Sequence, residues 1–291
     1  MIDYSALQAL AEVIRHQSFE KAAQSLGLTQ SAVSQRISGL ERDHGEKLLV
    51  RKQPYRATSK GELLLGLLHK VRLLESQYVE SFDDQGRLPQ VKIAMNRDSL
   101  ELWFDRFLAT SEFADRIRLE IVADDQDLTL NYLRSGQADI AISNQSQALP
   151  NYESELLGRM AYVIVATPQF KDRYFSRGLS EAALRQAPAV LFDDKDGLHK
   201  RFLESSYQFT SPFPFHLIPS IKGFRYAILS GYGYGLIPMM DVKEDLERGD
   251  LVLLSQRHKE TLSLYLHHWG LMSDLIKEFI DALKRYSSDL I

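Results

Sequence analysis

Apolar residues recur at two different spacings along this 291-residue chain, and the change of spacing divides it into two parts. Up to about residue 82 they recur every three or four positions, as on one face of a helix, for example at Val33, Ile37 and Leu40. Beyond the polar segment 83–89, short apolar runs alternate with helical patterns. We therefore expect an all-α N-terminal part and an α/β C-terminal part.

Residues 18–41 have the pattern of two short helices joined by a tight turn. Ser18 is placed to cap the first helix, Gly27 to end it, and Thr29 to cap the second. The apolar residues of the second helix form a stripe that would be buried against the first. This pattern predicts a helix-turn-helix, an element that reads DNA in many proteins.

The outer face of the second helix carries hydrogen-bonding side chains that fit a major groove. The candidate DNA-contacting residues on it are Thr29, Gln30, Ser31, Ser34, Gln35, Arg36 and Ser38. The alternative is an ordinary helical hairpin with a solvated face, but such a face more typically carries Glu and Lys. Positions 30–40 hold no acidic residue, which favours DNA reading.

Residues 48–61 alternate apolar and basic side chains, which predicts a short two-stranded wing. Arg51, Lys52 and Arg56 would reach phosphates there, whereas the alternative is a plain polar hairpin. Residues 1–60 hold nine basic and six acidic residues, a formal charge of +3, and the rest of the chain carries −7. A basic head on an acidic body is expected when one domain alone contacts nucleic acid.

Residues 59–82 form one long predicted helix without proline. Leu63, Leu67, Val71 and Leu74 recur on it at helical spacing, with further leucines beside them. This apolar surface is too broad for a lone solvated helix. We expect the helix to pair with its copy in a second chain, because dimeric heads read paired half-sites. The alternative is packing against the rest of the same chain.

Predicted strands and helices alternate beyond residue 89. The predicted strands are residues 91–96, 117–124, 138–143, 161–167, 188–192 and 234–239, and the predicted helices are residues 99–110, 128–136, 179–186, 222–233 and 273–286. Such alternation implies mainly parallel sheets. We expect two α/β lobes with a cleft between them.

Polar residues follow several of these strands, at the end where ligands bind in open α/β sheets. The candidate effector-binding residues there are Asn96, Asp98, Ser99, Asp124, Ser143 and Asp193. The first three lie at a helix start, where a hydroxyl and free amides favour a carboxylate. One such anion site beside several carboxylates fits a basic amino acid. The alternative is that the aspartates are helix caps.

Composition narrows the function further. The chain has 44% hydrophobic residues, 25% charged residues and no cysteine, so disulfides and thiolate chemistry are excluded. The first residues lack the pattern of a signal peptide, and no apolar run reaches about 18 residues. We expect a cytoplasmic protein without a membrane span.

No catalytic, metal or cofactor motif stands out. Gly231, Gly233 and Gly235 follow a predicted helix and precede a strand, the reverse of a dinucleotide-binding fingerprint. The eight histidines have no metal-ligand spacing. We expect no cofactor, no metal and no enzymatic activity. The rival interpretations are a sequence-tolerant architectural DNA binder, and an enzyme or solute-binding protein with an accessory helical hairpin.

Several segments resemble one family. AAQSLGLTQSAVSQRISGLE, the G-x-x-LLVR that follows and TSKGELLL resemble the winged helix-turn-helix of LysR-type transcriptional regulators. Size and domain order extend the resemblance over the whole chain. NRDSLELW, QALP and FDDKDGLHKRFL further resemble the lysine- and arginine-responsive ArgP/LysG group.

The resemblance implies three parts along the chain. They are a winged helix-turn-helix DNA-binding domain in residues 1–58, a linker and dimerisation helix in residues 59–88, and an effector-binding domain in residues 89–291. The last would consist of two Rossmann-like lobes of the type 2 periplasmic-binding-protein kind. Lobe I would take about residues 89–165 and 268–291, and lobe II about residues 166–267.

The resemblance also implies partners. We expect a homodimer or homotetramer that binds double-stranded promoter or operator DNA and takes lysine or arginine as its effector, with RNA polymerase as a further candidate partner. Trp103 would flank the effector's alkyl chain, or is otherwise a core residue. Arg97, Lys222 and Arg225 depart from this expectation, because they put positive charge near the cleft. A different small metabolite is therefore the alternative effector.

Overall fold

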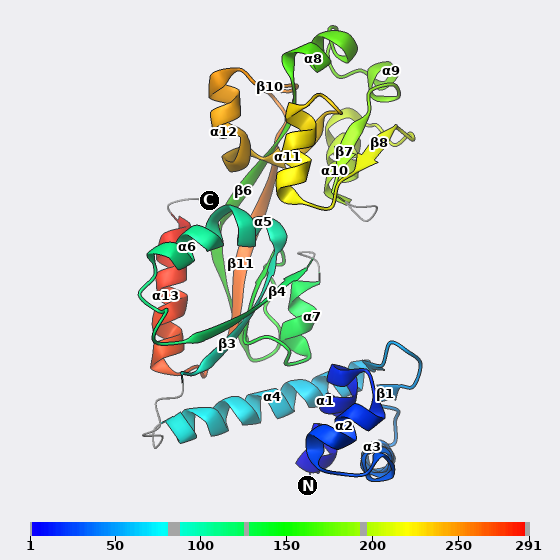
Figure 1. The fold of residues 1–291 in the computed structure, drawn as a ribbon, viewed down its shortest axis with the longest axis vertical. Coiled ribbons are helices and arrows are strands. Elements are labelled where there is room, and N and C mark those ends of the chain that lie inside the picture. The colour runs from blue at the N-terminus through cyan, green and yellow to red at the C-terminus, as the bar shows by residue number, and fades with distance from the viewer. Residues whose placement is uncertain (1, 81–87, 125–127, 193–196, 289–291) are drawn as a thin grey trace.

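The computed structural model describes residues 2–80, 88–124, 128–192 and 197–288. A helical head, a first α/β lobe and a second α/β lobe follow one another along the long axis of the molecule (Figure 1). One long helix runs between the head and the first lobe. This arrangement confirms the predicted division into an all-α N-terminal part and an α/β C-terminal part.

The head is helical apart from a two-stranded wing, the linker is one helix, and the two lobes mix helices with strands. The helices are α1 (Tyr4–His16), α2 (Phe19–Leu26), α3 (Gln30–His44), α4 (Ser59–Glu80), α5 (Arg97–Ser99), the π-helical η1 (Leu100–Phe104), α6 (Asp105–Thr110), α7 (Thr129–Arg134), α8 (Pro168–Tyr174), α9 (Glu181–Leu184), α10 (Gly197–Tyr207), α11 (Ile221–Leu229), α12 (Met239–Arg248) and α13 (Asp274–Ser288). The strands are β1 (Leu49–Val50), β2 (Arg56–Ala57), β3 (Gln90–Asn96), β4 (Arg118–Asp124), β5 (Ile140–Ser143), β6 (Tyr152–Ala166), β7 (Ala189–Leu191), β8 (Phe215–Leu217), β9 (Gly235–Pro238), β10 (Val252–Leu253) and β11 (Glu260–Trp269).

The head is a three-helix core with a wing. Val33 and Ile37 of α3 are fully buried and share one hydrophobic cluster with Leu7 and Leu10 of α1. The wing strands β1 and β2 pair antiparallel, with Leu49 opposite Ala57. The predicted helix-turn-helix and wing are both confirmed.

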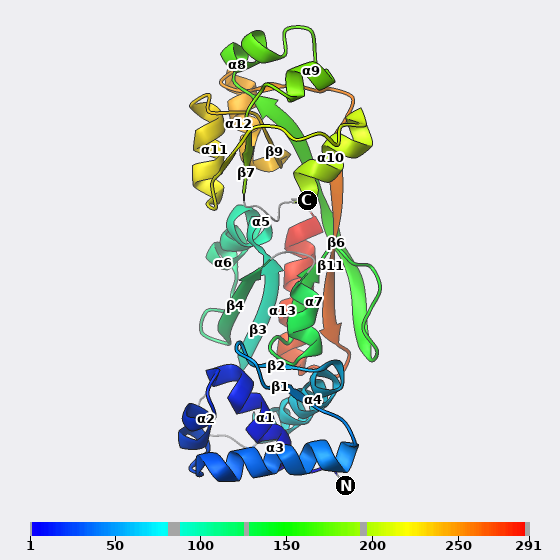
Figure 2. The ribbon, with the colours of Figure 1, turned by 90° about the vertical axis from the view of Figure 1, so that its right-hand side faces the viewer.

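One seven-stranded sheet runs through both lobes in the order β10-β6-β11-β5-β3-β4, with β9 also paired to β6. The prediction of mainly parallel sheets is wrong. Among the described strands of this sheet, the parallel pairings are those of β3 with β4 and of β3 with β5. β6 and β11 pair antiparallel with each of their neighbours. The reason is that β6 and β11 are long strands that cross from lobe I into lobe II, one in each direction (Figure 2).

One large apolar cluster runs through both lobes, and a smaller one packs beneath α11 and α12. In lobe I, Trp103, Phe104 and Phe279 pack into the largest hydrophobic cluster, to which α13 contributes one side. The chain therefore returns to lobe I at its C-terminal helix, where the Ser287 hydroxyl donates to the Leu157 carbonyl (Figure 1). In lobe II, β7 pairs parallel with β8, and α11 and α12 pack against β6 and β9. No helix of the described residues is long and apolar enough to span a membrane.

A buried glutamate fixes the wing to α3. Glu41 is 4% exposed, and its Oε1 accepts from the amides of Leu48 at 3.1 Å and Leu49 at 3.3 Å. Its Oε2 accepts from the Lys47 ammonium at 3.0 Å. Burial by itself raises the pKa of Glu41, but these hydrogen bonds outweigh burial and hold that pKa below its usual range.

Glu41→Ala would leave two buried amides unpaired, so we expect the head to lose roughly 2–5 kcal/mol of unfolding free energy. Glu41→Gln keeps an acceptor oxygen and should lose less. Because the folded-state pKa of Glu41 lies below that of the unfolded chain, its stabilisation should be present above about pH 4.5 and fade as the pH falls further.

Both tryptophans, Trp103 and Trp269, lie outside the head, so tryptophan fluorescence would not report its unfolding. Hydrogen exchange of the amides of residues 4–50 measures the stability of the head instead. Glu20→Ala, an exposed glutamate on α2, is the matched control. Equal exchange rates in Glu41→Ala and Glu20→Ala would contradict the structural role of Glu41.

Candidate functional site

The start of α3, the candidate recognition helix, is fixed by two caps and a glycine. The Ser18 hydroxyl accepts from the Lys21 amide, and the Thr29 hydroxyl accepts from the Ala32 amide at 3.2 Å. Gly27 ends α2 with a φ of +64°, a conformation that L side chains rarely adopt. The three predicted signals are therefore the ones that shape the turn.

The predicted DNA-contacting residues lie on the face of α3 opposite its buried stripe. Thr29, Gln30, Ser31, Gln35 and Ser38 are exposed, whereas Ser34 and Arg36 are half-buried. Apart from Arg36, their side chains are short or carry amides, so a DNA backbone can approach α3 closely and base edges can be reached.

The wing residues lie beside this face. Lys52 and Arg56 are exposed. Arg51 instead reaches back to α3, where its guanidinium donates to the Ser38 hydroxyl at 3.2 Å and lies 3.5 Å from Glu41. Arg51 therefore supports the recognition helix as well as adding charge beside it. Sequence reasoning missed Glu41, because nothing local indicates that its carboxylate meets the wing.

Three strands place candidate effector residues at the same end of the sheet, where β3, β4 and β5 each finish. β4, β3 and β5 are neighbours and parallel, and the register sets Asn96 opposite Asp124. Ala94 pairs with Ala141, so Ser143 lies beside Asn96 at the end of the next strand. The structure thus brings together residues from three separate segments. Asp193, the candidate from lobe II, lies outside the described residues.

The helix that follows β3 carries buried polar groups. Ser99 is fully buried and Asn96 is 5% exposed. Within the described part of the chain, neither the Ser99 hydroxyl nor the Asn96 Oδ1 has a hydrogen-bond partner. A buried polar atom without a partner costs about 1–3 kcal/mol, so this end of the sheet is suited to a polar ligand.

Two tyrosines hold the cleft carboxylates, and sequence reasoning missed both. Tyr162 on β6 donates to Asp98 and Tyr132 on α7 donates to Asp124, each at 2.5 Å. The hydrogen bond to Asp124, followed by burial, raises the pKa of Tyr132 to about 12, so its phenol remains a donor. The N-caps of α5 and α7 are Asn96 and Leu128, so neither aspartate is a helix cap.

Trp103 lies in the core, whereas Arg97 and Arg225 each contact a residue of lobe II. Trp103 is fully buried in the lobe I core, edge-to-face with Phe104 at 5.9 Å, which favours its interpretation as a core residue. The Arg97 guanidinium lies 5.3 Å from the Phe192 ring centre, so it reaches from lobe I to lobe II. Arg225 is tied to Asp245 by two hydrogen bonds of 2.8 Å.

A polar cavity lies between the lobes. This cavity, of about 260 Å³, lies between η1 and α6 of lobe I and α11 and α12 of lobe II. Its charged lining consists of Glu101, Asp105, Arg106, Arg225, Asp241 and Glu244. Burial raises the pKa of Asp241, while the nearby Arg225 lowers it less. Carboxylates outnumber guanidinium groups in this lining, so the cavity favours a cationic group over an anionic one.

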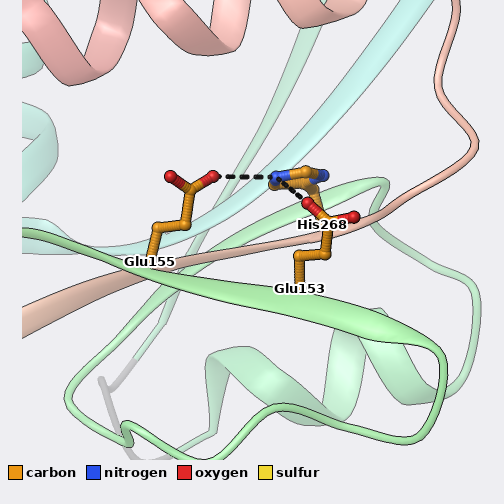
Figure 3. A group of neighbouring side chains, drawn as sticks. All are labelled: Glu153, Glu155 and His268. Atoms are coloured by element: carbon orange, nitrogen blue, oxygen red, sulfur yellow. Dashed lines mark hydrogen bonds and ion pairs between the residues drawn. The ribbon is translucent and has the colours of Figure 1, made fainter.

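One cluster outside the cleft has metal-ligating residue types. Glu153 and Glu155 on β6 flank His268 on β11, with ligand atoms within 4.8 Å of one another (Figure 3). The Lys284 ammonium lies 2.9 Å from Glu155 and holds the pKa of that carboxyl below its usual range. Because the Lys284 ammonium already donates to both oxygens of Glu155, the cluster is better explained as an ion-pair brace between α13 and the sheet.

Two family models match the chain. The model described as bacterial regulatory helix-turn-helix protein, lysR family, matches residues 4–62, and the LysR substrate binding domain matches residues 85–288. The HTH-type transcriptional regulator ArgP of Photobacterium profundum is 38% identical over 289 residues, which cover 98% of this chain and 97% of the relative.

Two solved structures share the fold over the full length. ArgP from Mycobacterium tuberculosis has a TM-score of 0.87 at 32% identity, covering 100% of this chain and 99% of that one. Full-length LysG from Corynebacterium glutamicum with bound effector Arg has a TM-score of 0.79 at 29% identity, covering 98% of each chain.

Proposed function

We propose that this chain, which belongs to the LysR family of bacterial transcriptional regulators, senses a basic amino acid, L-arginine or L-lysine. Binding would change how the protein holds operator DNA at genes of amino-acid transport or metabolism. The protein would act as a cytoplasmic regulator without a catalytic step or a cofactor.

The effector assignment rests on one observation above all. Buried Ser99 and Asn96 lie at the same sheet edge as the carboxylates of Asp98 and Asp124. The first pair suits an α-carboxylate and α-amine, and the aspartates suit a cationic side chain. LysG, a structural relative, holds arginine as its effector, which supports the same ligand class here.

The DNA assignment rests on the exposed face of α3. Its hydroxyl and amide side chains would read base edges in the major groove, with Gln35 suited to adenine. Lys52 and Arg56 of the wing would contact phosphates and fix the register of the head on the duplex. RNA polymerase is a further candidate partner at the promoter.

The outer side of α4 supports a homodimer, or a homotetramer built from dimers. Leu63 is 66% exposed and Leu74 is 47% exposed, and they lie about three turns apart on one helix. Burying such surface, at about 25 cal/mol per Å², would favour pairing of α4 with a second copy. Two heads held together in this way would read paired half-sites.

Gln35→Ala should cost about 1–3 kcal/mol of affinity for operator DNA and little for random DNA, because it removes a base contact. Lys52→Ala should weaken both and lower the salt slope by about 1, because it removes a phosphate contact. Fluorescence anisotropy against an operator selected from a random DNA pool measures both.

Lys200→Ala, an exposed lysine of lobe II, is the control for lost positive charge. An equal loss of operator and random DNA affinity in Gln35→Ala would show that α3 does not read bases through this residue.

L-arginine or L-lysine should raise the thermal midpoint of the effector domain. At a ligand concentration 100 times the dissociation constant, binding should add about 2.7 kcal/mol to the free energy of unfolding. Asp98→Asn should weaken binding roughly 10- to 100-fold, because a charge-assisted hydrogen bond to the ligand is lost. Asp172→Asn, an exposed aspartate on α8, should bind as the wild type does. A midpoint raised only by a neutral or acidic metabolite would overturn the effector and leave the regulator.

A further inference from the structure

Helix α4 is part of the head. Leu65 and Leu68, in its first half, are 6% and 5% exposed and lie in the same hydrophobic cluster as Leu7 and Leu10 of α1. Gly61 fits against the Leu48 carbonyl of the wing, with which a Cβ at this position would collide. The first half of α4 therefore moves with the DNA-reading helices as one body.

The same helix also contacts lobe I. The His69 Nε2 lies 2.9 Å from the Asp139 Oδ1, and Asp139 is 4% exposed. The other oxygen of Asp139 accepts from the Lys92 amide at 2.7 Å, so the carboxylate is fixed at the start of β3. Lys70, the next residue on α4, lies 4.6 Å from the centre of the Tyr152 ring.

Two glycines make this contact close. A Cβ at Gly66 would lie 2.7 Å from the Arg134 carbonyl, and a Cβ at Gly136 would collide with the His69 Cβ. Real side-chain atoms do not approach so closely, so any larger residue at either position would push α4 away from lobe I. The contact is thus built for direct backbone approach.

Helix α7 connects this contact to the effector cleft. Its Tyr132 donates to Asp124 at the end of β4, while Arg134, the last residue of α7, and Gly136, two residues beyond it, lie against α4. Beneath α7 the sheet presents Ala94 and Ala141. Leu130 and Leu133 of α7 share one apolar cluster with these alanines, and Val122 and Tyr152 pack against it, so any shift of α7 must alter this packing.

We propose that α7 transmits the state of the effector cleft to the DNA-binding head, with Tyr132 of α7 as the positioning residue toward the cleft and His69 of α4 as the positioning residue toward the head. The proposal rests on the proposed function in one respect, that the cleft binds a basic amino acid. A ligand cation that pairs with Asp124 competes with Tyr132 for the carboxylate. The packing of α7 on the sheet then changes, and the contact of α4 with lobe I changes with it.

The connection can be tested without any effector. Tyr132→Phe removes only the hydroxyl that reaches Asp124, and we expect the amides of residues 66–75 to exchange about fivefold faster. Tyr226→Phe, an exposed tyrosine of lobe II, is the matched control. Hydrogen-exchange mass spectrometry of the full chain measures both. Unchanged exchange of residues 66–75 in Tyr132→Phe would overturn the connection.

The coupling to DNA is tested with L-arginine as the probe. In the wild type, arginine should change operator affinity by about 5- to 150-fold. In His69→Ala that factor should fall below about twofold, although calorimetry should show arginine binding as in the wild type. Asp139→Asn, which keeps an acceptor for Lys92, should act in the same direction, and the exposed Asp115→Asn should not.

The outcomes separate the two proposals. A wild type that binds neither arginine nor lysine overturns the proposed effector, and the exchange of residues 66–75 then decides the connection alone. A wild-type response to arginine that persists in both His69→Ala and Asp139→Asn overturns the connection and leaves the effector assignment standing.

Discussion

The antiparallel pairing of β6 with β11 is the interaction on which the effector domain depends. The two strands pair along their length, from Glu260 opposite Tyr162 to Trp269 opposite Tyr152, with a register shift after Leu264. Because both strands cross between the lobes, the lobes share one sheet and can move relative to each other only by bending these strands. Tyr162, which holds Asp98, lies on this crossing, so the cleft is tied directly to the segment that must bend.

The chemistry of the cleft follows from how its carboxylates are held. Each of the two aspartates accepts a hydrogen bond from a tyrosine hydroxyl, which orients its carboxylate. Arg225, which would oppose a cationic ligand, is bound to Asp245, and Arg97 lies over an aromatic ring. These two guanidinium groups therefore have partners of their own in lobe II.

The head is joined to this domain through a single helix that packs against both bodies. Its leucines lie in the head core, and its His69 lies against the buried Asp139 of lobe I. Any change in one body that alters the position of α4 must also displace its contacts with the other. The contact of His69 with Asp139 and the two close glycine contacts fix where α4 lies on lobe I.

The sequence by itself determined the local features. The caps of α2 and α3, the buried stripe of α3 and the polar strand ends after β3, β4 and β5 follow from spacing and residue type within short segments. Tertiary structure alone decided the pairings between distant segments, including Tyr162 with Asp98, His69 with Asp139, Glu41 with the wing, and the antiparallel course of β6 and β11. Periodicity reports which face of an element is buried, but not which other element buries it, because that depends on how the whole chain packs.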